Sequence, residues 1–379
     1  MKIKIDVSPY DEANETLVNN THPSDYRNPT PAHRYNLVVV GAGTAGLVSA
    51  IGAAIIGARV ALVERNLTGG DCLNYGCVPS KSIIRSSRIA ARIRDSGRYG
   101  IHVDRAPKVD FGAVMERMRK IRAAISVHDS VQRIREAGVD MFLGEAHFTG
   151  RDMLEVEGAQ LRFSRAAIAT GARPVQGHIE GIDPEEILTN ETVFSLTQRP
   201  RRIAVIGGGP IGCEAAQTFA RLGSEVTLFH EHGHILDKED DDAAAIIQDR
   251  FTAEGIRLIL GTRAESGRKD GSEFVLSFRT NGGESTCRVD AILMGVGRKP
   301  NVGALALEQA EVAYDPQKGV IVDDHLRTSN PRIYAAGDVC MRWKFTHAAD
   351  AGARLLLRNA LFFGHEKLSS LVMPWCTYT

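Results

Sequence analysis

The sequence predicts an α/β protein built from two parallel-sheet domains. A short apolar strand, a glycine-rich turn, a helix and a second strand occur in that order within residues 37–63, and the same order recurs within residues 202–229. Both turns have the spacing GxGxxG, and they begin 166 residues apart, at Gly41 and Gly207. Internal similarity of this kind indicates two copies of one supersecondary unit, here a strand–helix–strand unit of a parallel sheet.

The composition is that of an ordinary globular protein. The 379 residues are enough for two or three domains, with 43% hydrophobic and 24% charged residues. Basic and acidic residues number 46 each, so net charge gives no argument for nucleic acid or a membrane surface as a partner. Six cysteines are too few for a secreted disulfide scaffold of this size. We therefore expect a cytoplasmic protein.

Residues 1–34 contain four prolines and no apolar run of the length of a signal peptide. We expect them to form a polar arm that lies on the surface or is mobile and has no catalytic role. Residues 35–58 contain no charged side chain, and a stretch of this length could span a membrane. Five glycines interrupt this stretch, however, so a buried strand, a tight turn and a buried helix explain it better.

The first unit is predicted as a strand at 37–40, a helix at 44–57 and a strand at 59–63. In its GxGxxG turn the first glycine permits the turn, the second lets a pyrophosphate approach the backbone, and the third lets helix and strand pack closely. The helix N-terminus would then face the phosphates. Glu64 ends the second strand, where an acid is expected to bind a ribose hydroxyl.

A cysteine pair follows within residues 69–81, GGDCLNYGCVPSK. The spacing of Cys72 and Cys77 suits neither a zinc site, which needs further ligands, nor a stabilising cross-link, because so short a loop constrains the unfolded chain little. In a reducing compartment such a pair indicates redox catalysis. Cys77 lies just before Pro79 at the expected start of a helix, so it is better placed than Cys72 for stabilisation of its thiolate.

The next part of the chain leads to a turn of small residues. Helices are predicted over 82–94 and 111–137, and strands over 139–148, 153–156 and 162–169. The second helix is rich in Arg and Lys, and a solvated face explains this better than an anion site. The last strand ends in ATGARP at residues 169–174, a turn that a cofactor can approach.

The second unit is predicted as a strand at 202–206, a helix at 213–222 and a strand at 225–229, around the turn at 207–212. Two such turns imply two nucleotide ligands. The spacing from Gly41 to Glu64, applied to Gly207, places His230 where an NAD-type site has its ribose acid. His230 suits a 2′-phosphate, whereas the adjacent Glu231 would repel one and no arginine is adjacent, so NAD and NADP both remain open.

The rest of the chain contains two further motifs. Strands are predicted near 258–260, 273–278 and 290–294, and a helix over 348–363. Between them stand GVGRKPN at 295–301 and RIYAAGD at 332–338. The carboxylate of Asp338 either accepts a hydrogen bond from a sugar-like chain of a cofactor or caps a helix.

These motifs, in this order, resemble those of the pyridine nucleotide–disulfide oxidoreductases, from Tyr35 to Thr379. The shared elements are the two GxGxxG turns, the ribose acid, GGxCx4CxPxK, ATGxxP, GxGRxPN and AxGD. The cysteine stretch, Asn28-Pro29 in the arm and GGGPIGCE at 207–214 are most similar to mercuric reductase-like members. The family also includes glutathione reductase and dihydrolipoamide dehydrogenase.

The resemblance implies two Rossmann-like domains, the second inserted in the first. FAD would bind the first and NAD or NADP the second. The expected division is an arm at 1–34, an FAD-binding domain at 35–185 and 298–366, an NAD(P)-binding domain at 186–297, and the start of a dimerisation domain at 367–379. In the family that last domain supplies a histidine base from the partner subunit, so we expect a homodimer for the full-length form and no base within these 379 residues.

The resemblance also implies a relay of electrons. They would pass from NAD(P)H to FAD, to the disulfide of Cys72 and Cys77, and on to a small-molecule disulfide or Hg(II), whose affinity for soft thiolates suits such a site. Cys77 would face the flavin and Cys72 would attack the substrate. Lys81 and Glu214 match the ion pair beside the flavin, where a cation stabilises the reduced ring.

The cofactor-binding residues expected from the motifs fall into two groups. Those for FAD are Gly41, Gly43, Gly46, Glu64, Lys81, Ala146, Thr170, Gly171, Asp338 and Thr346. Those for NAD(P) are Gly207, Gly209, Gly212, His230 and Gly297. No metal site is expected, because Cys213, Cys287, Cys340 and Cys376 have no paired spacing and are interpreted as small core residues.

Three other functions remain open. The chain is also consistent with a flavin- and nucleotide-binding redox sensor without turnover, with a dihydrolipoamide dehydrogenase-like enzyme, or with an NAD(P)H oxidase whose cysteine pair is structural. Mercuric reductases also carry a second cysteine pair at the C-terminus and often an N-terminal metal-binding domain. Neither is expected in these 379 residues, which weakens the mercury interpretation.

Overall fold

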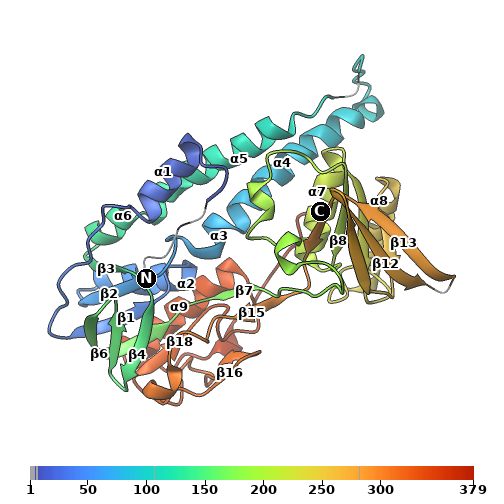
Figure 1. The fold of residues 1–379 in the computed structure, drawn as a ribbon. Coiled ribbons are helices and arrows are strands. Elements are labelled where there is room, and N and C mark those ends of the chain that lie inside the picture. Colours follow the sequence, from blue (N-terminus) through green and yellow to red (C-terminus); the bar gives the residue numbers. More distant parts are fainter. Residues whose placement is uncertain (1–4, 6, 106, 281) are drawn as a thin grey trace. The chain divides into compact units, whose positions relative to one another are not determined.

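The computed structural model describes residues 5, 7–105, 107–280 and 282–379. The chain forms two compact units, each assembled from separate stretches (Figure 1). The first comprises Met1–Asn74, Arg122–Arg173 and Arg298–Trp375, and the second comprises Tyr75–Ile121, Pro174–Gly297 and Cys376–Thr379. Packing therefore groups residues 75–121 with the second unit, whereas the motifs placed them in the FAD-binding domain. The nucleotide bound by each expected domain stays a prediction.

The first unit is built on a sheet of order β3-β2-β1-β6-β5-β4, with β18 paired to β6. Its parallel strands are β1 (Tyr35–Val40), β2 (Val60–Glu64), β3 (Val139–Leu143), β6 (Ala159–Ile168) and β18 (Ile333–Ala335). Its antiparallel strands are β4 (Ala146–Gly150) and β5 (Met153–Val156). The expected strand at 139–148 is thus two strands, because Gly144 at φ +148° turns the chain between them.

Helices α2 (Thr44–Ile55) and α9 (Thr346–Leu361) pack against each other in this unit. Both contribute buried alanines and leucines to one hydrophobic core with β1 and β2. The uncharged stretch at 35–58 is therefore β1, a turn and α2, and no helix in the described ranges is long and apolar enough to cross a membrane. Since the parallel strands are buried on both faces, they read as continuous apolar runs.

The N-terminal arm differs from its expected form. Residues 1–4 and 6 lie outside the described part, but helix α1 (Glu12–Thr21) follows, with Asp11 accepting a hydrogen bond from Asn14 N as its N-cap. Asn14, Leu17 and Thr21 are buried. The arm is therefore packed against the first unit. The sequence did not predict this, because only a few residues of α1 are buried and most of them are polar.

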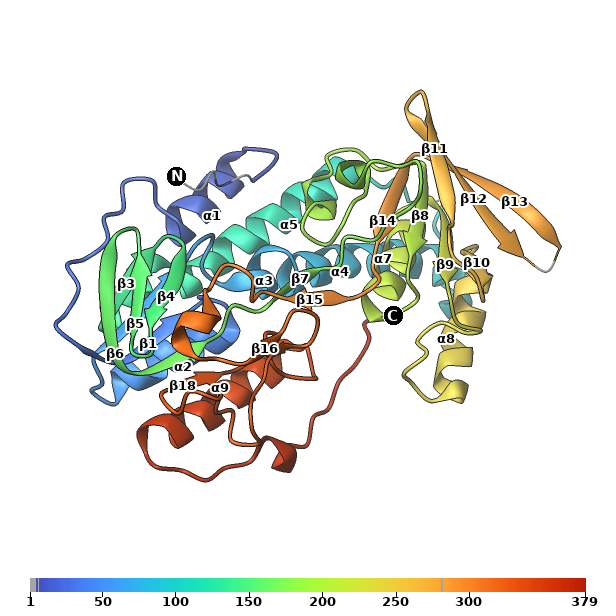
Figure 2. The same cartoon turned by 60° about the horizontal axis from the view of Figure 1, so that its bottom comes forward.

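The second unit contains a parallel sheet of order β10-β9-β8-β14. Its strands are β8 (Arg202–Ile206), β9 (Glu225–His230), β10 (Arg257–Leu260) and β14 (Ala291–Met294). An antiparallel sheet of β11 (Ser266–Asp270), β12 (Glu273–Thr280) and β13 (Gly283–Val289) completes it (Figure 2). The remaining short strands pair as β7 (Ala172–Pro174) with β15 (Arg298–Pro300), and β16 (Tyr314–Asp315) with β17 (Gly319–Val320).

Helices α4 (Cys77–Arg94), α7 (Pro210–Arg221) and α8 (Asp241–Ala253) belong to the second unit, and α4 packs against α7. Helix α4 begins at Cys77, five residues before the expected start, because the motif residues form its first turn. The expected helix at 111–137 is α5 (Phe111–Ser126) and α6 (Val131–Glu136). They are separate because Ser130 caps α6 by accepting from Arg133 N at 3.2 Å.

Candidate functional site

The first glycine turn joins β1 to α2 and can hold only glycine at its key positions. Gly41 has φ +103°, and a Cβ there would lie 2.4 Å from Ala169 O. A Cβ at Gly46 would lie 1.7 Å from Gly41 O, which is the close helix–strand contact expected of the third glycine. Gly43 is the N-cap of α2 and provides no side-chain cap, so the first backbone N–H groups of the helix are open to a ligand.

Glu64 is held directly against this turn. Its Oε2 accepts a hydrogen bond from Ala42 N at 2.7 Å, and its Oε1 accepts from Asn66 N at 2.8 Å. A carboxylate has further lone pairs, so Glu64 can still accept from a ligand hydroxyl. The structure thus places Glu64 beside the turn, as the spacing predicted.

Thr170 and Gly171 lie next to the same turn, because the preceding residue, Ala169, approaches Gly41 closely. The Thr170 hydroxyl donates to Asn301 O at 2.8 Å, and Asn301 Nδ2 donates back to Thr170 O at 2.8 Å. The two motifs ATGARP and GVGRKPN are therefore joined, which the sequence alone did not show. Gly171 at φ +68° has open space around its Cα, so its conformation rather than crowding requires glycine.

Asp338 lies in a cluster of charges within the first unit. Arg298 Nη1 is 2.9 Å from Asp71 Oδ2, and Arg298 Nε is 3.3 Å from Asp338 Oδ2. Lys344 Nζ donates to the backbone oxygen of Asp338 at 2.9 Å. Burial raises the pKa of Asp338, while Arg298 and Lys344 oppose this, and burial lowers the pKa of Lys344.

Asp338 does not cap a helix, because the helix that follows begins at Thr346 after its N-cap Phe345. The alternative role of Asp338 as an N-cap is therefore wrong. Arg298, Asp71 and Lys344 were not among the expected site residues. Arg298 and Asp71 stand inside recognised motifs, which was the available signal, whereas Lys344 had none.

The two cysteines lie on successive helices. Cys72 is the middle residue of α3 (Gly70–Asn74) and is half-buried. Cys77 is exposed and is the first residue of α4, whose N-cap Gly76 offers no side-chain cap. Although α4 begins earlier than the predicted range 82–94, Cys77 lies at a helix N-terminus as the motif indicated, and there the N–H groups and the helix dipole stabilise a thiolate.

Lys81 and Glu214 form the expected ion pair. Lys81 Nζ donates to Glu214 Oε2 at 2.7 Å, and Glu214 is only 8% exposed. Lys81 lies one helical turn after Cys77, so both share a face of α4. Tyr378 completes the group, since its backbone N–H donates to Glu214 Oε1 at 3.0 Å and its ring centroid is 4.7 Å from Lys81 Nζ. No sequence signal pointed to Tyr378.

The second glycine turn reproduces the first. Gly207 has φ +111°, and a Cβ there would lie 2.4 Å from Gly295 O. A Cβ at Gly212 would lie 1.9 Å from Gly207 O. Gly209 is the N-cap of α7 and has open space where its Cβ would be. Gly297 lies beyond β14 at φ +127°.

His230 takes the position of Glu64 in this second unit. Its Nδ1 accepts a hydrogen bond from Gly208 N at 3.0 Å. The separation of 22 residues between these two partners is the same as that between Ala42 and Glu64 in the first unit. His230 is 8% exposed, and burial lowers its pKa although Asp237 opposes this. Because Nδ1 is the acceptor, the neutral ring carries its proton on Nε2. That atom lies 3.3 Å from Asp237 Oδ1 but makes no hydrogen bond within the described residues.

Glu231 is paired with an arginine that is distant in sequence. Arg263 Nε donates to Glu231 Oε2 at 2.6 Å. His232 Nε2 lies 3.8 Å from Glu231 Oε1. The sequence showed no adjacent arginine, but the fold brings Arg263 from beyond β10 to the end of β9, and so compensates the charge that was expected to repel a phosphate.

Comparison with known proteins identifies the family of this chain. Residues 35–353 match the family described as "Pyridine nucleotide-disulphide oxidoreductase". The chain belongs to this family. Its members named below are flavin-dependent disulfide oxidoreductases and related reductases, as the motifs predicted.

Among curated relatives, the chain is 33% identical to mercuric reductase of Bacillus cereus over 369 residues, which are 97% of this chain and 58% of that protein. It is 32% identical to dihydrolipoyl dehydrogenase of Bacillus subtilis over 349 residues, 90% of this chain and 75% of that protein. Among solved structures, the HOCl-induced flavoprotein disulfide reductase RclA from Escherichia coli aligns with a TM-score of 0.77 at 26% identity, over 88% of this chain and 73% of that one. The chain spans between 58% and 63% of the first three mercuric reductases.

The first unit fits the FAD of this family. The N–H groups at the turn of Gly41 could hold a pyrophosphate, and the remaining lone pairs of Glu64 could accept from a ribose hydroxyl. Helix α9 begins at half-buried Thr346 without a side-chain cap, so a second helix N-terminus is open as well. Ala146 is buried in the core at the start of β4, so a contact with FAD would involve its backbone.

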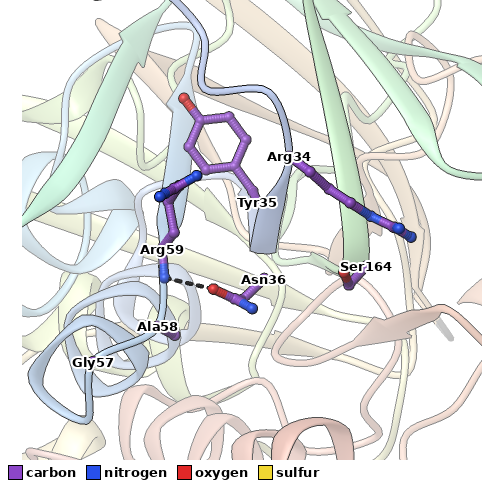
Figure 3. Close-up of a pocket in the computed structure, with 7 residues that line it drawn as sticks. All are labelled: Arg34, Tyr35, Asn36, Gly57, Ala58, Arg59 and Ser164. Atoms are coloured by element: carbon purple, nitrogen blue, oxygen red, sulfur yellow. Dashed lines mark hydrogen bonds between the residues drawn. The ribbon is translucent and has the colours of Figure 1, made fainter.

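One open pocket carries no candidate function. It lies at the starts of β1 and β2, the ends opposite to the glycine turn, and has a volume of about 560 Å³. Figure 3 shows the Arg34 and Arg59 guanidinium groups pointing in different directions, with Asn36 accepting from Arg59 N at 2.8 Å. The pocket therefore lacks converging groups for an anion.

The four other cysteines agree only in part with their interpretation as core residues. Cys213 and Cys287 are buried, and Cys340 is half-buried. Burial raises the pKa of Cys213 and of Cys340 to about 12, so both are inert thiols at neutral pH. Cys376 is exposed, which corrects its expected position in a core.

Proposed function

We propose that this chain carries the electron-transfer machinery of an FAD-dependent NAD(P)H oxidoreductase that reduces a small disulfide or Hg(II) through Cys72 and Cys77. The arrangement at the start of α4 supports this most strongly. Cys77 occupies the open N-terminus of the helix, and Lys81, paired with Glu214 at 2.7 Å, lies one turn later on the same face. A structural cysteine pair needs neither feature.

The chain's residues divide the work as follows. The glycine turn at Gly41 and Glu64 would hold FAD, which would supply two-electron transfer between NAD(P)H and the disulfide of Cys72 and Cys77. The helix N-terminus stabilises Cys77 as a thiolate, and Glu214 orients the Lys81 cation toward developing negative charge. The Cys72 thiolate attacks a substrate disulfide, one sulfur leaves as a thiolate and takes a proton, and Cys77 then displaces the second sulfur to restore the Cys72–Cys77 disulfide.

An anaerobic titration of the flavin-loaded full-length protein with NADPH tests the relay. We expect a long-wavelength absorbance from a thiolate beside oxidised flavin, its loss in Cys77→Ser and its retention in Cys72→Ser. Persistence of the band in Cys77→Ser would contradict the proposal. Unchanged turnover in Cys72→Ala would instead favour an NAD(P)H oxidase with a structural cysteine pair.

The end of β9 favours NADPH as the electron donor. The ribose acid is replaced by His230, and Arg263 compensates the charge of Glu231. A 2′-phosphate would therefore meet histidine and arginine donors, which bind phosphate well. We expect Arg263→Ala to raise KM for NADPH about tenfold more than KM for NADH, since loss of one charge-assisted contact costs about 1.5 kcal/mol or more. Equal changes would contradict NADPH as the donor.

The final acceptor and the assembly are tested in the full-length protein. The named relatives include both mercuric reductases and dihydrolipoyl dehydrogenases at similar identity, so acceptors of both kinds should be compared by NADPH oxidation. The family resemblance further supports a homodimer in which the partner subunit supplies the histidine base for Cys72. Sedimentation equilibrium tests the dimer, and absence of turnover with every acceptor despite flavin reduction would favour a redox sensor.

A further inference from the structure

The helix that carries Cys72 depends on its neighbours for its position. Helix α3 has five residues, and isolated helices of that length are unstable in water. Asn74, its last residue, ties the helix to its own start, because Asn74 Nδ2 donates to Gly70 O at 2.8 Å and to Thr68 O at 3.1 Å. Contacts from outside the helix must fix this small assembly in the unit.

The N-terminal arm holds the start of the assembly. Thr68 N donates to Thr21 O at 3.2 Å, and both threonines are fully buried. His22 Nδ1 lies 2.6 Å from Asn66 O. The segment between Glu64 and α3 is thus bonded to the end of α1.

Arg122 holds the end of the assembly. Its Nη1 donates to Asn74 O at 2.7 Å, and its Nη2 donates to Asn14 Oδ1 at 2.7 Å. Arg122 is 4% exposed, Asn14 0% and Asn74 1%. Asn14 is itself fixed, since its Nδ2 donates to Pro9 O at 2.7 Å. One guanidinium from α5 therefore connects the terminal carbonyl of the Cys72 helix to the arm.

We propose that Asn14 and Arg122 are positioning residues, which couple the N-terminal arm to α3 and so hold Cys72 in place for exchange with Cys77. The proposal rests on the proposed function, in which these cysteines form a redox disulfide. An α3 that is already fixed loses less conformational entropy when Cys72 forms a disulfide. The arm thereby gains a role in the redox site although it contributes no reacting atom.

The test measures the disulfide rather than turnover. Full-length holoprotein is equilibrated in glutathione redox buffers, and the fraction of Cys72–Cys77 disulfide is determined by alkylation and peptide mass spectrometry. We expect Arg122→Gln and Asn14→Ala each to lower the equilibrium constant for disulfide formation about tenfold. Arg122→Lys, which keeps a donor, should recover part of it. The double variant of Asn14 and Arg122 should lower the equilibrium constant no more than the more damaging single variant does, because both substitutions break the same connection between the arm and α3.

Asn20→Ala is the matched control. Asn20 also joins α1 to α5, since its Nδ2 donates to Ser126 Oγ at 2.9 Å, but neither side chain is hydrogen-bonded to α3 within the part of the chain that the structure describes. Thermal unfolding is recorded for every variant, and Asn14→Ser, whose shorter side chain withdraws the acceptor from Arg122, replaces Asn14→Ala if the latter does not fold. Equilibrium constants unchanged from wild type, or lowered equally by Asn20→Ala, would overturn the inference. Failure of wild-type protein to form the disulfide at any glutathione ratio would overturn the proposed function instead.

Discussion

At the scale of single residues, the candidate site consists of charged and polar groups with defined partners. Lys81 is the clearest case, because it meets the carboxylate of Glu214 and the ring of Tyr378. A cation held by a nearly buried acid is preorganised, so it costs no reorientation when negative charge develops nearby. Its effect should therefore appear in the rate of electron transfer.

We predict that Lys81→Met lowers the rate of flavin reduction by NADPH about 10²-fold, the effect typical of removing one preorganised electrostatic group. Stopped-flow absorbance of the loaded protein measures this rate. Lys120→Met is the control, because Lys120 is an exposed lysine whose ion pair with Glu116 lies on α5. A wild-type rate in Lys81→Met would show that the ion pair is only structural.

His230 should make nucleotide binding depend on pH. Its pKa is lowered by burial, with Asp237, His232 and Glu231 as the charged groups around it. The neutral ring is therefore favoured in the folded protein, and the corresponding stability is complete above about pH 6.5, the ordinary value for histidine, and is lost as the pH falls below it. Protonation would set an N–H of the ring against the N–H of Gly208.

We accordingly predict that KM for NADH, which has no 2′-phosphate for a protonated ring to attract, rises as the pH falls below about 6.5 in the wild type. His230→Gln keeps an acceptor but does not titrate, so its KM should stay nearly constant over the same range. Initial rates from pH 5 to 8 at saturating acceptor provide the comparison. Parallel profiles for the two proteins would assign the pH dependence to another group.

At the scale of elements, the two strand–turn–helix units differ little in backbone and more in side chains. In each turn, a Cβ added at the first or third glycine would lie within 2.4 Å of an equivalent backbone carbonyl oxygen, so only glycine fits these positions. Within one turn, however, the glycines serve different purposes. Gly212 is required for packing, whereas Gly209 leaves space for a ligand.

This difference predicts opposite outcomes for two alanine substitutions. Gly212→Ala places a Cβ 1.9 Å from Gly207 O and should reduce the free energy of unfolding by about 4 kcal/mol or more. Gly209→Ala meets no atom within 4 Å and should fold normally, yet weaken nucleotide binding because the methyl group occupies the ligand's approach. Denaturant unfolding and nucleotide titration distinguish the two, and similar stability for both variants would contradict the prediction.

At the scale of the whole molecule, the arm is part of the first unit. Leu17 is 1% exposed, and Asn14 and Thr21 beside it are fully buried. The interpretation of residues 1–34 as a loose polar segment missed this, because three buried positions in a polar helix leave almost no hydrophobic pattern. An integral arm should contribute to global stability.

We predict that Leu17→Ala reduces the free energy of unfolding by about 2–4 kcal/mol, the usual cost of a truncated core leucine. Val18→Ala, at a half-buried neighbour, should cost clearly less. Urea unfolding of the two variants tests this. Wild-type stability in Leu17→Ala would show that the arm unfolds separately.

The sequence by itself determined the two strand–turn–helix units, the cysteine pair and the expectation of a Lys81–Glu214 pair. The units and the cysteines depend on local spacing, which a single chain displays, and the ion pair was read from a family motif. Helix boundaries were less accurate, as at α4, since the first turn of that helix is the redox motif itself.

Only the tertiary structure decided which side chains complete the site. Arg263 at Glu231, Arg298 between Asp71 and Asp338, and Arg122 between Asn14 and Asn74 join residues that are far apart in the chain. No spacing rule reports such pairs, because they depend on where the ends of different elements meet and on which polar groups burial leaves to be satisfied. His230 differs from these residues, because the spacing from Gly41 to Glu64 located it and the structure added only its hydrogen bond with Gly208 N.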